Sequence, residues 1–221
     1  MELQGALALA IAAAREAAEL LRAEFHRPGG PRGPRGKCEA DTEAERLLRD
    51  RLVSASGWSF LGEETGRHGD AGPLWIVDPN DGTDAFQRGM RGPAISIGLV
   101  RDGVPVLGVV FSYLAPDGEG DLFTWAEGCG PLQRNGSPVS PRRFTTLDRA
   151  PILVSHRADE APDANAVALA PARFITMPSL AYRLALAAVG DAAAGVSLPA
   201  PSSWDCAAGH ALLRGAGKVL L

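Results

Sequence analysis

The sequence contains few cysteines and no long apolar segment. Its 221 residues include only Cys38, Cys129 and Cys206, which lie far apart and form no CxxC pair. Such a sparse, odd set argues against a disulfide framework or a cysteine-based zinc site, and it is typical of reduced thiols in a cytoplasmic protein. No stretch approaches the ~20 apolar residues that a membrane span requires. We therefore expect a cytoplasmic protein with no membrane association.

The N-terminus argues against a signal peptide, and the overall charge argues against a nucleic-acid-binding protein. The apolar run 6–14 is preceded only by the acidic Glu2, whereas a signal peptide carries a basic segment at that place. Lys and Arg together number 22 against 26 Asp and Glu, which gives a net charge of −4 and a pI near 5.6. A nucleic-acid-binding protein usually shows a basic face, so we expect no nucleic-acid partner. A small anionic substrate remains compatible if a metal supplies local positive charge.

The periodicity of apolar residues predicts a mixed fold. With 46% hydrophobic residues, the chain can bury a core for one large domain or two closely packed halves. Segments 42–45 fit a capping box, and Asp102-Gly103 fits the turn of a hairpin. The predicted helices are 2–26, 41–53, 161–170, 179–189 and 206–213, and the predicted strands are 59–62, 74–77, 94–101, 104–113, 122–126, 152–155 and 218–221. This order indicates α+β or mixed α/β, arranged as an N-terminal half 1–145 and a C-terminal half 146–221 in a single compact unit.

The segment 75–83, WIVDPNDGT, is the most informative stretch. It places Asp78 and Asp81 three residues apart at the end of an apolar strand, and Pro79, Asn80 and Gly82 force the turn that follows. Hard divalent cations prefer such rigidly held oxygen ligands, with room left for water and phosphate. Taken alone, the segment also fits an Asx-rich turn between two core strands.

Further acidic residues occur at ends of elements. Glu63 and Glu64 follow a short predicted strand, Asp41 begins the second predicted helix, and Asp205 precedes the last one. Singly, the Glu63-Glu64 pair fits a solvated turn and Asp205 fits a helix N-cap. Together with Asp78 and Asp81, these acids predict a carboxylate cluster that holds metal ions.

Three ordered blocks, 62–64, 75–83 and 204–209, resemble the inositol monophosphatase superfamily of Mg2+-dependent, lithium-sensitive phosphatases. Weaker matches occur at 40–45, 96–98, 135–140 and 155–157. The resemblance implies a layered αβαβα sandwich of the inositol monophosphatase and fructose-1,6-bisphosphatase type. It also implies a homodimer that hydrolyses the phosphate monoester of a small metabolite with metal-activated water.

The resemblance also implies roles for individual residues. The first Mg2+ would be held by Glu63, Asp78 and the backbone carbonyl of Asn80, and the second by Asp78, Asp81 and Asp205. Asp41 would reach a third ion through water, so two or three ions are expected, with Mn2+ as a substitute. Most of these ligands lie in the half 1–145, and Asp205 lies in the half 146–221.

Thr83, with Glu63 behind it, would orient the attacking water in this resemblance. The backbone N–H groups of Gly82 and Thr83, at a helix start, would bind the phosphate.

The chain departs from the family at several positions. No acidic residue lies between Asp191 and Asp205, where family members that act on inositol phosphates carry an acid that contacts substrate. Arg88 and Arg91 stand in a normally apolar loop, and they either face solvent or read a second anionic group of the substrate. His156 is either a loop histidine without catalytic duty or a contact to the leaving group. The sequence stops at Leu221, so we expect a fold shortened at the C-terminus.

Several functions remain open at this stage. The leading hypothesis is a Mg2+-dependent phosphomonoesterase acting on a sugar phosphate, inositol phosphate, histidinol phosphate or 3'-phosphoadenosine 5'-phosphate. A 3'(2'),5'-bisphosphate nucleotidase or fructose-1,6-bisphosphatase-like activity is an alternative, in which Arg88 and Arg91 read the distal phosphate. A non-catalytic homologue that binds a phosphorylated ligand or a protein partner is another.

Overall fold

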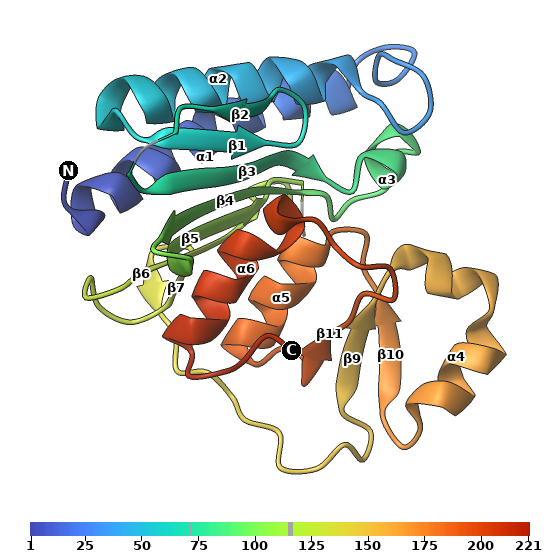
Figure 1. Cartoon of the computed structure of the whole chain (residues 1–221). Helices are drawn as coiled ribbons and strands as arrows, with labels where there is room; N and C mark the ends of the chain where they lie inside the picture. Colours follow the sequence, from blue (N-terminus) through green and yellow to red (C-terminus); the bar gives the residue numbers. More distant parts are fainter. Residues whose placement is uncertain (71, 115–116) are drawn as a thin grey trace.

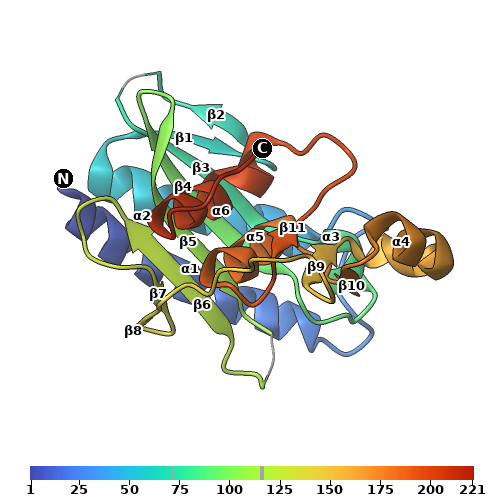
Figure 2. The same ribbon diagram turned by 90° about the horizontal axis from the view of Figure 1, so that it is seen from below.

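The computed structural model describes residues 1–70, 72–114 and 117–221, and their elements form alternating layers (Figure 1). Helices α1 and α2 cover one face of a large sheet, and α5 and α6 cover its other face. A smaller sheet lies beyond α5, with α4 on its outer side. Figure 2 shows α5 and α6 lying across the large sheet, with β9, β10 and α4 to one side. The layered mixed fold predicted from the sequence is confirmed.

The helices are α1 (Leu3–Phe25), α2 (Glu39–Ser56), α3 (Thr83–Gln87), the 3-10 helix η1 (His156–Glu160), α4 (Pro162–Leu169), α5 (Leu180–Val189) and α6 (Ser203–Gly215). The large sheet has the order β2-β1-β3-β4-β5-β6-β7-β8. Its strands are β1 (Ser59–Gly62), β2 (Gly66–His68), β3 (Leu74–Asp81), β4 (Ala94–Arg101), β5 (Val104–Ser112), β6 (Asp121–Ala126), β7 (Gln133–Arg134) and β8 (Ser137–Pro138). The small sheet has the order β10-β9-β11, with β9 (Pro151–Val154), β10 (Arg173–Thr176) and β11 (Ala194–Gly195).

Local sequence explains where several helices begin and end. The buried face of α1 is almost entirely alanine, which allows the helix to approach its neighbours closely: Ala6, Ala10, Ala13, Ala14, Ala17 and Ala18. Helix α2 ends at Gly57, whose φ of 70° is left-handed and whose N–H bonds to the Val53 carbonyl. Helix α5 begins after Ser179, whose hydroxyl accepts the Tyr182 N–H.

Two glycines let α6 sit directly on the large sheet. A Cβ at Gly98 of β4 would lie 2.7 Å from the Cβ of Ala207, and one at Gly108 of β5 would overlap the Ala208 carbonyl. Because no side chain intervenes, the first turn of α6, which carries Asp205, is held against the sheet. The small residues of the predicted 204–209 block therefore position a carboxylate.

Two predicted features are wrong. Residues 218–221 form no strand, and they run instead across the face of α5 and α6. The predicted capping box at 42–45 is absent, because α2 begins at Glu39, with Cys38 as its N-cap residue. The side chains of Thr42 and Glu45 point instead to the loop that follows β1, where each has a partner.

The division into halves at residue 145 stays a prediction. Helix α6, from the second predicted half, packs on β4 and β5 of the first. One buried cluster also joins Val110 and Phe123 with Leu184 and Leu212. Within the described residues, none of the helices is long and apolar enough to cross a membrane.

Candidate active site

The end of β3 brings Asp78 and Asp81 to one side of the strand. Residues three apart normally point to opposite faces, because side chains alternate along a strand. Here Asp78 pairs with Ser96 and Asp81 with Ala94, so β3 contains one extra residue opposite β4. The extra residue, at Pro79 and Asn80, shifts the alternation of side chains by one position. Asp78 and Asp81 therefore point to the same face of the strand.

Three carboxylates converge beyond this point. One oxygen from each of Asp78, Asp81 and Asp205 lies within 4.8 Å of the others. Each carboxylate is also held by a donor: the Asn80 N–H reaches Asp78 at 2.8 Å, and the Ser202 N–H reaches Asp205 at 2.7 Å. The predicted grouping of these three acids is therefore present in the structure. Taken singly, Asp205 fits a helix N-cap, but in the structure the N-cap of α6 is Ser202. Asp205 lies in the first turn of the helix and forms a capping box with Ser202.

Asp81 is anchored by the second half of the chain. Its Oδ2 accepts the Ser179 hydroxyl at 2.7 Å and the Ala181 N–H at 2.7 Å, both at the start of α5. Three segments thus meet in the cluster: the end of β3, the start of α5 and the start of α6.

The electrostatics of the cluster favour a cation. Burial raises the pKa of Asp78 well above its usual range, and the charges of Asp81 and Glu63 raise it further. Burial likewise raises the pKa of Asp81 to about 6 and raises that of Asp205. Carboxylates that repel one another in a low-dielectric site are stabilised by a hard cation. The donor set, made of oxygens only, fits Mg2+ or Mn2+.

Glu63 approaches this cluster from β1. That strand runs parallel to β3 with Gly62 opposite Val77, so Glu63 follows β1 beside Asp78. Burial, followed by the charges of Glu64 and Asp205, raises the pKa of Glu63 to about 7. Glu63 is not one of the three converging acids, and its predicted role as a ligand stays a prediction.

The loop that carries Glu63 is held by Glu45. The carboxylate of this fully buried residue accepts the N–H groups of Glu64 at 2.8 Å and Thr65 at 2.6 Å. A Cβ at Gly62 would overlap that carboxylate, so the glycine is required for this contact. This role of Glu45 is not predictable from the sequence, because Glu45 fits a capping box equally well.

A second polar network lies behind the turn. Asp41 is almost fully buried and accepts two side-chain donors at 2.8 Å, the Thr83 hydroxyl and the Asn80 amide. The Asn80 amide oxygen in turn accepts the hydroxyl of buried Tyr113. The Asn80 side chain is therefore committed to this network, which leaves its backbone carbonyl as the group able to face an ion. Burial raises the pKa of Asp41 to about 6, against the effect of both donors.

Gly82 and Thr83 form the start of α3. Gly82 has a φ of 107°, a left-handed conformation that favours glycine, and its carbonyl accepts the Phe86 N–H. A Cβ there would also lie 3.4 Å from the Pro178 side chain. The turn is therefore closed on one side by the segment that leads to α5. The predicted phosphate contact at these N–H groups stays a prediction.

Arg88 and Arg91 are exposed. Arg88 lies 3.5 Å from the Asp84 carboxylate, which also accepts the Arg35 guanidinium at 2.9 Å. Arg91 also has an interaction partner. Their predicted contact with a second anionic group of the substrate remains a prediction.

The small sheet carries further residues near the acidic cluster. Strands β9, β10 and β11 are parallel, so the loops after them leave from one edge. These loops carry His156, Ser179 and the segment 196–202. His156 Nε2 lies 3.7 Å from Asp84, and both ring nitrogens are buried without a hydrogen-bond partner among the described residues.

Sequence reasoning missed Ser179, Arg183 and Tyr113. Arg183 is the only charged residue in α5, and a charge within the Ala/Leu-rich segment 179–189 was a signal available in the sequence. Ser179 and Tyr113 carry no comparable signal, because Ser at a helix start and Tyr in a strand are ordinary.

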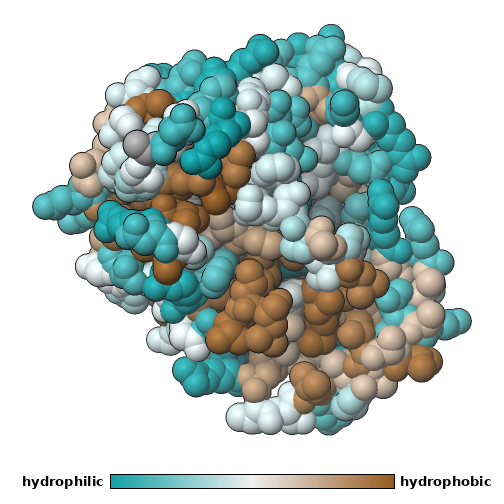
Figure 3. Space-filling model, in the orientation of Figure 1, coloured by the Kyte–Doolittle hydropathy of each residue, from teal (hydrophilic) through white to brown (hydrophobic). Residues whose placement is uncertain are grey.

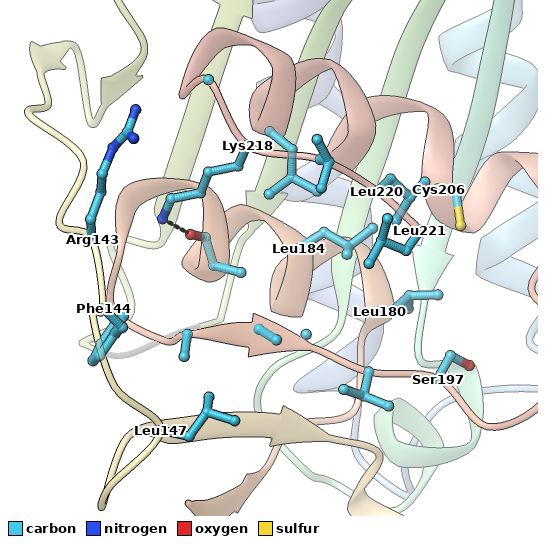
Figure 4. Close-up of a pocket in the computed structure, with 18 of the residues that line it drawn as sticks. Arg143, Phe144, Leu147, Leu180, Leu184, Ser197, Cys206, Lys218, Leu220 and Leu221 are labelled. Carbon is cyan, nitrogen blue, oxygen red and sulfur yellow. Dashed lines mark hydrogen bonds between the residues drawn. The ribbon is translucent and has the colours of Figure 1, made fainter.

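A large cavity lies away from these acids. It has a volume of about 860 Å³ and is lined mainly by apolar residues of α5, α6, segment 143–147 and the C-terminal residues (Figure 4). Lys218 crosses it to bond the Ala187 carbonyl. Hydrophobic side chains gather around the C-terminal residues on this face (Figure 3). None of the converging carboxylates lines the cavity, so it is not the site of the predicted chemistry.

Comparisons with known proteins agree with this geometry. Residues 2–221 match the inositol monophosphatase family. An uncharacterized protein of Sinorhizobium fredii is 38% identical over 192 residues, 80% of this chain and 63% of that protein. The probable inositol 1-monophosphatase ImpA of Mycobacterium tuberculosis is 32% identical over 195 residues, 82% of this chain and 69% of that protein. The structure of inositol monophosphatase from Anabaena superimposes with a TM-score of 0.80 at 26% identity, covering 98% of this chain and 83% of that chain.

Proposed function

The chain belongs to the inositol monophosphatase family, and on that premise we propose that it hydrolyses the phosphate monoester of a small metabolite with the help of Mg2+. The observation that carries the proposal is the convergence of Asp78, Asp81 and Asp205 within 4.8 Å, with raised pKa values. The matched region spans only 63% of the S. fredii relative, so activity, substrate and partners are all part of the proposal.

In this proposal Asp78, Asp81 and Asp205 hold one ion, and Glu63, Asp78 and the Asn80 carbonyl hold another. Asp41 reaches a third site through water. Such ions lower the pKa of a bound water and neutralise charge on phosphate and leaving group when they are present.

Thr83 orients the attacking water. Its hydroxyl donates to the Asp41 carboxylate at 2.8 Å, so the hydroxyl oxygen is left to accept a hydrogen from water. Glu63, behind Thr83, helps to position that water; its pKa near 7 is that of the metal-free protein, and an ion bound to its carboxylate would lower it. No serine or cysteine nucleophile is required.

Gly82 and Thr83 bind the phosphate in this proposal. Their N–H groups lie at the first turn of α3, where an N–H has no partner within the helix, and in this proposal both donate to the phosphate. The binding of phosphate in this proposal comes from these two N–H groups, and the turn at Gly82 fixes their direction.

A panel of phosphomonoesters tests the proposal directly. It holds sugar phosphates, inositol phosphates, histidinol phosphate, fructose 1,6-bisphosphate and 3'-phosphoadenosine 5'-phosphate, with Mg2+, with Mn2+ and with EDTA. We expect phosphate release from at least one member, lost with EDTA and restored by Mg2+. Release from none, with Mg2+ present, would overturn the proposal.

Calorimetric titration with Mg2+ separates an enzyme from a non-catalytic homologue. We propose two or three binding events. Replacing Asp78 should weaken two of them, and replacing Asp81 or Asp205 should weaken the one that both residues share with Asp78. A homologue that only binds a phosphorylated ligand or protein has no chemical need for these ions and would bind Mg2+ poorly.

We also propose a homodimer, as implied by the family. Light scattering during size-exclusion chromatography measures the mass in solution. A mass near twice the 23.1 kDa of the chain is expected, and a mass near 23.1 kDa would contradict it.

A further inference from the structure

Arg183 is a charged side chain that the proposed mechanism does not use. It lies on α5, one turn after Ser179, and only 4% of it is exposed. Charged residues are rarely buried to this degree unless they are paired. Two donors of Arg183 are committed: Nε to the Ser179 carbonyl at 3.2 Å and Nη1 to the Val196 carbonyl.

The remaining nitrogen, Nη2, has no hydrogen-bond partner among the described residues. Among the described residues, the buried side-chain nitrogens and oxygens without a partner are the two ring nitrogens of His156. Nη2 of Arg183 has no partner either, so it is not a buried atom. Nη2 therefore reaches solvent, although almost all of the side chain is covered. A guanidinium held rigidly by two carbonyls, with one free edge, is preorganised to receive a ligand.

The Arg183 side chain lies near the acidic cluster, because its Nε donates to the carbonyl of Ser179, the residue whose hydroxyl donates to Asp81. Burial lowers the pKa of Arg183, while the nearby charges of Asp81 and Asp205 raise it. Among the described residues Arg183 forms no ion pair with Asp81 or Asp205, and these two carboxylates act on its charge only from a distance. The guanidinium thus stands at the margin of the proposed metal and phosphate site.

Arg183 also joins two loops at the carboxyl edge of the small sheet. Ser179 follows β10, and Val196 follows β11 and begins the segment 196–203, which contains no acidic residue. His156, in the third loop of this edge, lies 3.7 Å from Asp84, and its buried ring nitrogens offer no group to a ligand. The Arg183 guanidinium lies between the loops that follow β10 and β11.

We propose that Arg183 reads a second anionic group of the substrate, a carboxylate or a further phosphate, on the part that leaves with the alkoxide oxygen. This inference rests on the proposed phosphatase function and narrows its substrate class. A guanidinium bonds such oxygens with directed, charge-assisted N–H groups, whereas a neutral polyol offers it no charge. Specificity then comes from the largely buried Arg183 rather than from the exposed Arg88.

A matched pair of substrates tests this inference. Glycerol 3-phosphate and 3-phosphoglycerate differ only in a hydroxymethyl group that is replaced by a carboxylate. We expect wild type to have the higher kcat/KM for 3-phosphoglycerate. In Arg183→Met this preference should fall by about tenfold to a hundredfold, mainly through KM, because one charge-assisted contact is lost.

Two further variants distinguish two roles of Arg183: recognition of the anionic group of the substrate, and structural support of the two loops that it joins. Arg183→Lys keeps the charge and should retain part of the preference, whereas a merely structural role would make Lys and Met equally harmful to both substrates. Arg88→Gln should leave the preference within about threefold of wild type, the range expected for an exposed ion pair. Equal losses for both substrates in Arg183→Met, or a lost preference in Arg88→Gln alone, would overturn the inference.

A binding experiment keeps this test independent of turnover. Phosphonoacetate and methylphosphonate are not phosphate esters, and they differ by the same carboxylate. At saturating Mg2+, calorimetry should show tighter binding of phosphonoacetate to wild type, and Arg183→Met should lose that difference. If no ester is hydrolysed, the proposed function fails while this measurement still decides the role of Arg183; equal binding of both phosphonates to wild type would reject it.

Discussion

Ser179 donates its hydroxyl to Asp81 at 2.7 Å across 98 residues of sequence. The bond joins the end of β3 to the start of α5. One serine therefore caps a helix and orients a proposed metal ligand, because its oxygen also accepts the Tyr182 N–H.

We predict that Ser179→Ala weakens Mg2+ binding. Loss of an outer partner of a metal ligand typically costs about 10- to 100-fold in affinity. Ser179→Thr keeps the hydroxyl and should stay closer to wild type. Mg2+ titration of phosphate release and calorimetry would both measure this; equal affinities for the Ala and Thr variants and wild type would contradict it.

We predict that Asp81→Asn abolishes activity and preserves the fold. The amide keeps the shape of the side chain but loses the negative charge that faces the ion. Turnover should therefore drop by more than about a hundredfold, a larger loss than that expected when only a hydrogen-bond partner of a metal ligand is removed. Asp50→Asn, at an exposed acid on α2 that pairs with Arg49, is the matched control. Circular dichroism would check folding, and retained turnover would remove Asp81 from the mechanism.

We predict a strong loss of kcat in Thr83→Ala. Without the hydroxyl between Asp41 and the water, the water is no longer oriented, and the expected loss is about 10²- to 10⁴-fold. Thr83→Ser keeps the oxygen and should recover much of the rate. If the Ala and Ser variants turn over substrate at equal rates, the hydroxyl does not orient the water.

The metal-free protein should become less stable as pH rises. The folded-state pKa values of Asp41 and Asp81 are about 6 and that of Glu63 is about 7, whereas unfolded Asp and Glu have values near about 4. Between these limits the folded state binds more protons, so this contribution to the free energy of unfolding is lost as pH rises through the folded pKa values.

Thermal melts with EDTA therefore should give a lower Tm at about pH 8 than at about pH 5. Added Mg2+ should raise the Tm most at the higher pH, where the carboxylates are ionised. In Asp81→Asn the pH dependence should be smaller. A Tm with EDTA that rises between these pH values would contradict the prediction.

Gly98→Ala should destabilise the protein and weaken Mg2+ binding. The added Cβ would lie 2.7 Å from the Ala207 Cβ, so α6 must move away from the sheet and carry Asp205 with it. Overpacking of this kind costs about 1–3 kcal/mol. Gly5→Ala in α1, where a Cβ meets only the Met1 side chain at 3.6 Å, is the control and should be neutral or stabilising. Denaturant melts would compare the two variants.

Much of the fold was predictable because local patterns and tertiary packing agree. The helices at 3–25 and 180–189 and the hairpin of β4 and β5 follow directly from apolar periodicity and turn residues. The short strands β7, β8 and β11, of two residues each, were missed, because so few residues carry no periodic signal. The end of the chain was mispredicted as a strand because Val219, Leu220 and Leu221 are β-prone in isolation.

The candidate site was predictable where its residues are adjacent in sequence. Asp78, Asp81 and Gly82 form one recognisable run, and Asp205 follows a tryptophan in another. Glu45 was not predictable as a site residue, and the charge of Arg183 within an apolar helix marked only its position, since both roles depend on which distant backbone groups the side chains meet.

The sequence by itself determined the type of chemistry: a strand that ends in two acids and a glycine turn, with further acids at ends of elements. Only the tertiary structure decided how those acids are held and what faces them. The irregular pairing after Asp78 aligns the carboxylates, and Ser179 reaches Asp81 from the other half of the chain. The physical reason is that charge and turn propensity belong to single residues, whereas the orientation of a buried polar group depends on partners that only folding brings within hydrogen-bond distance.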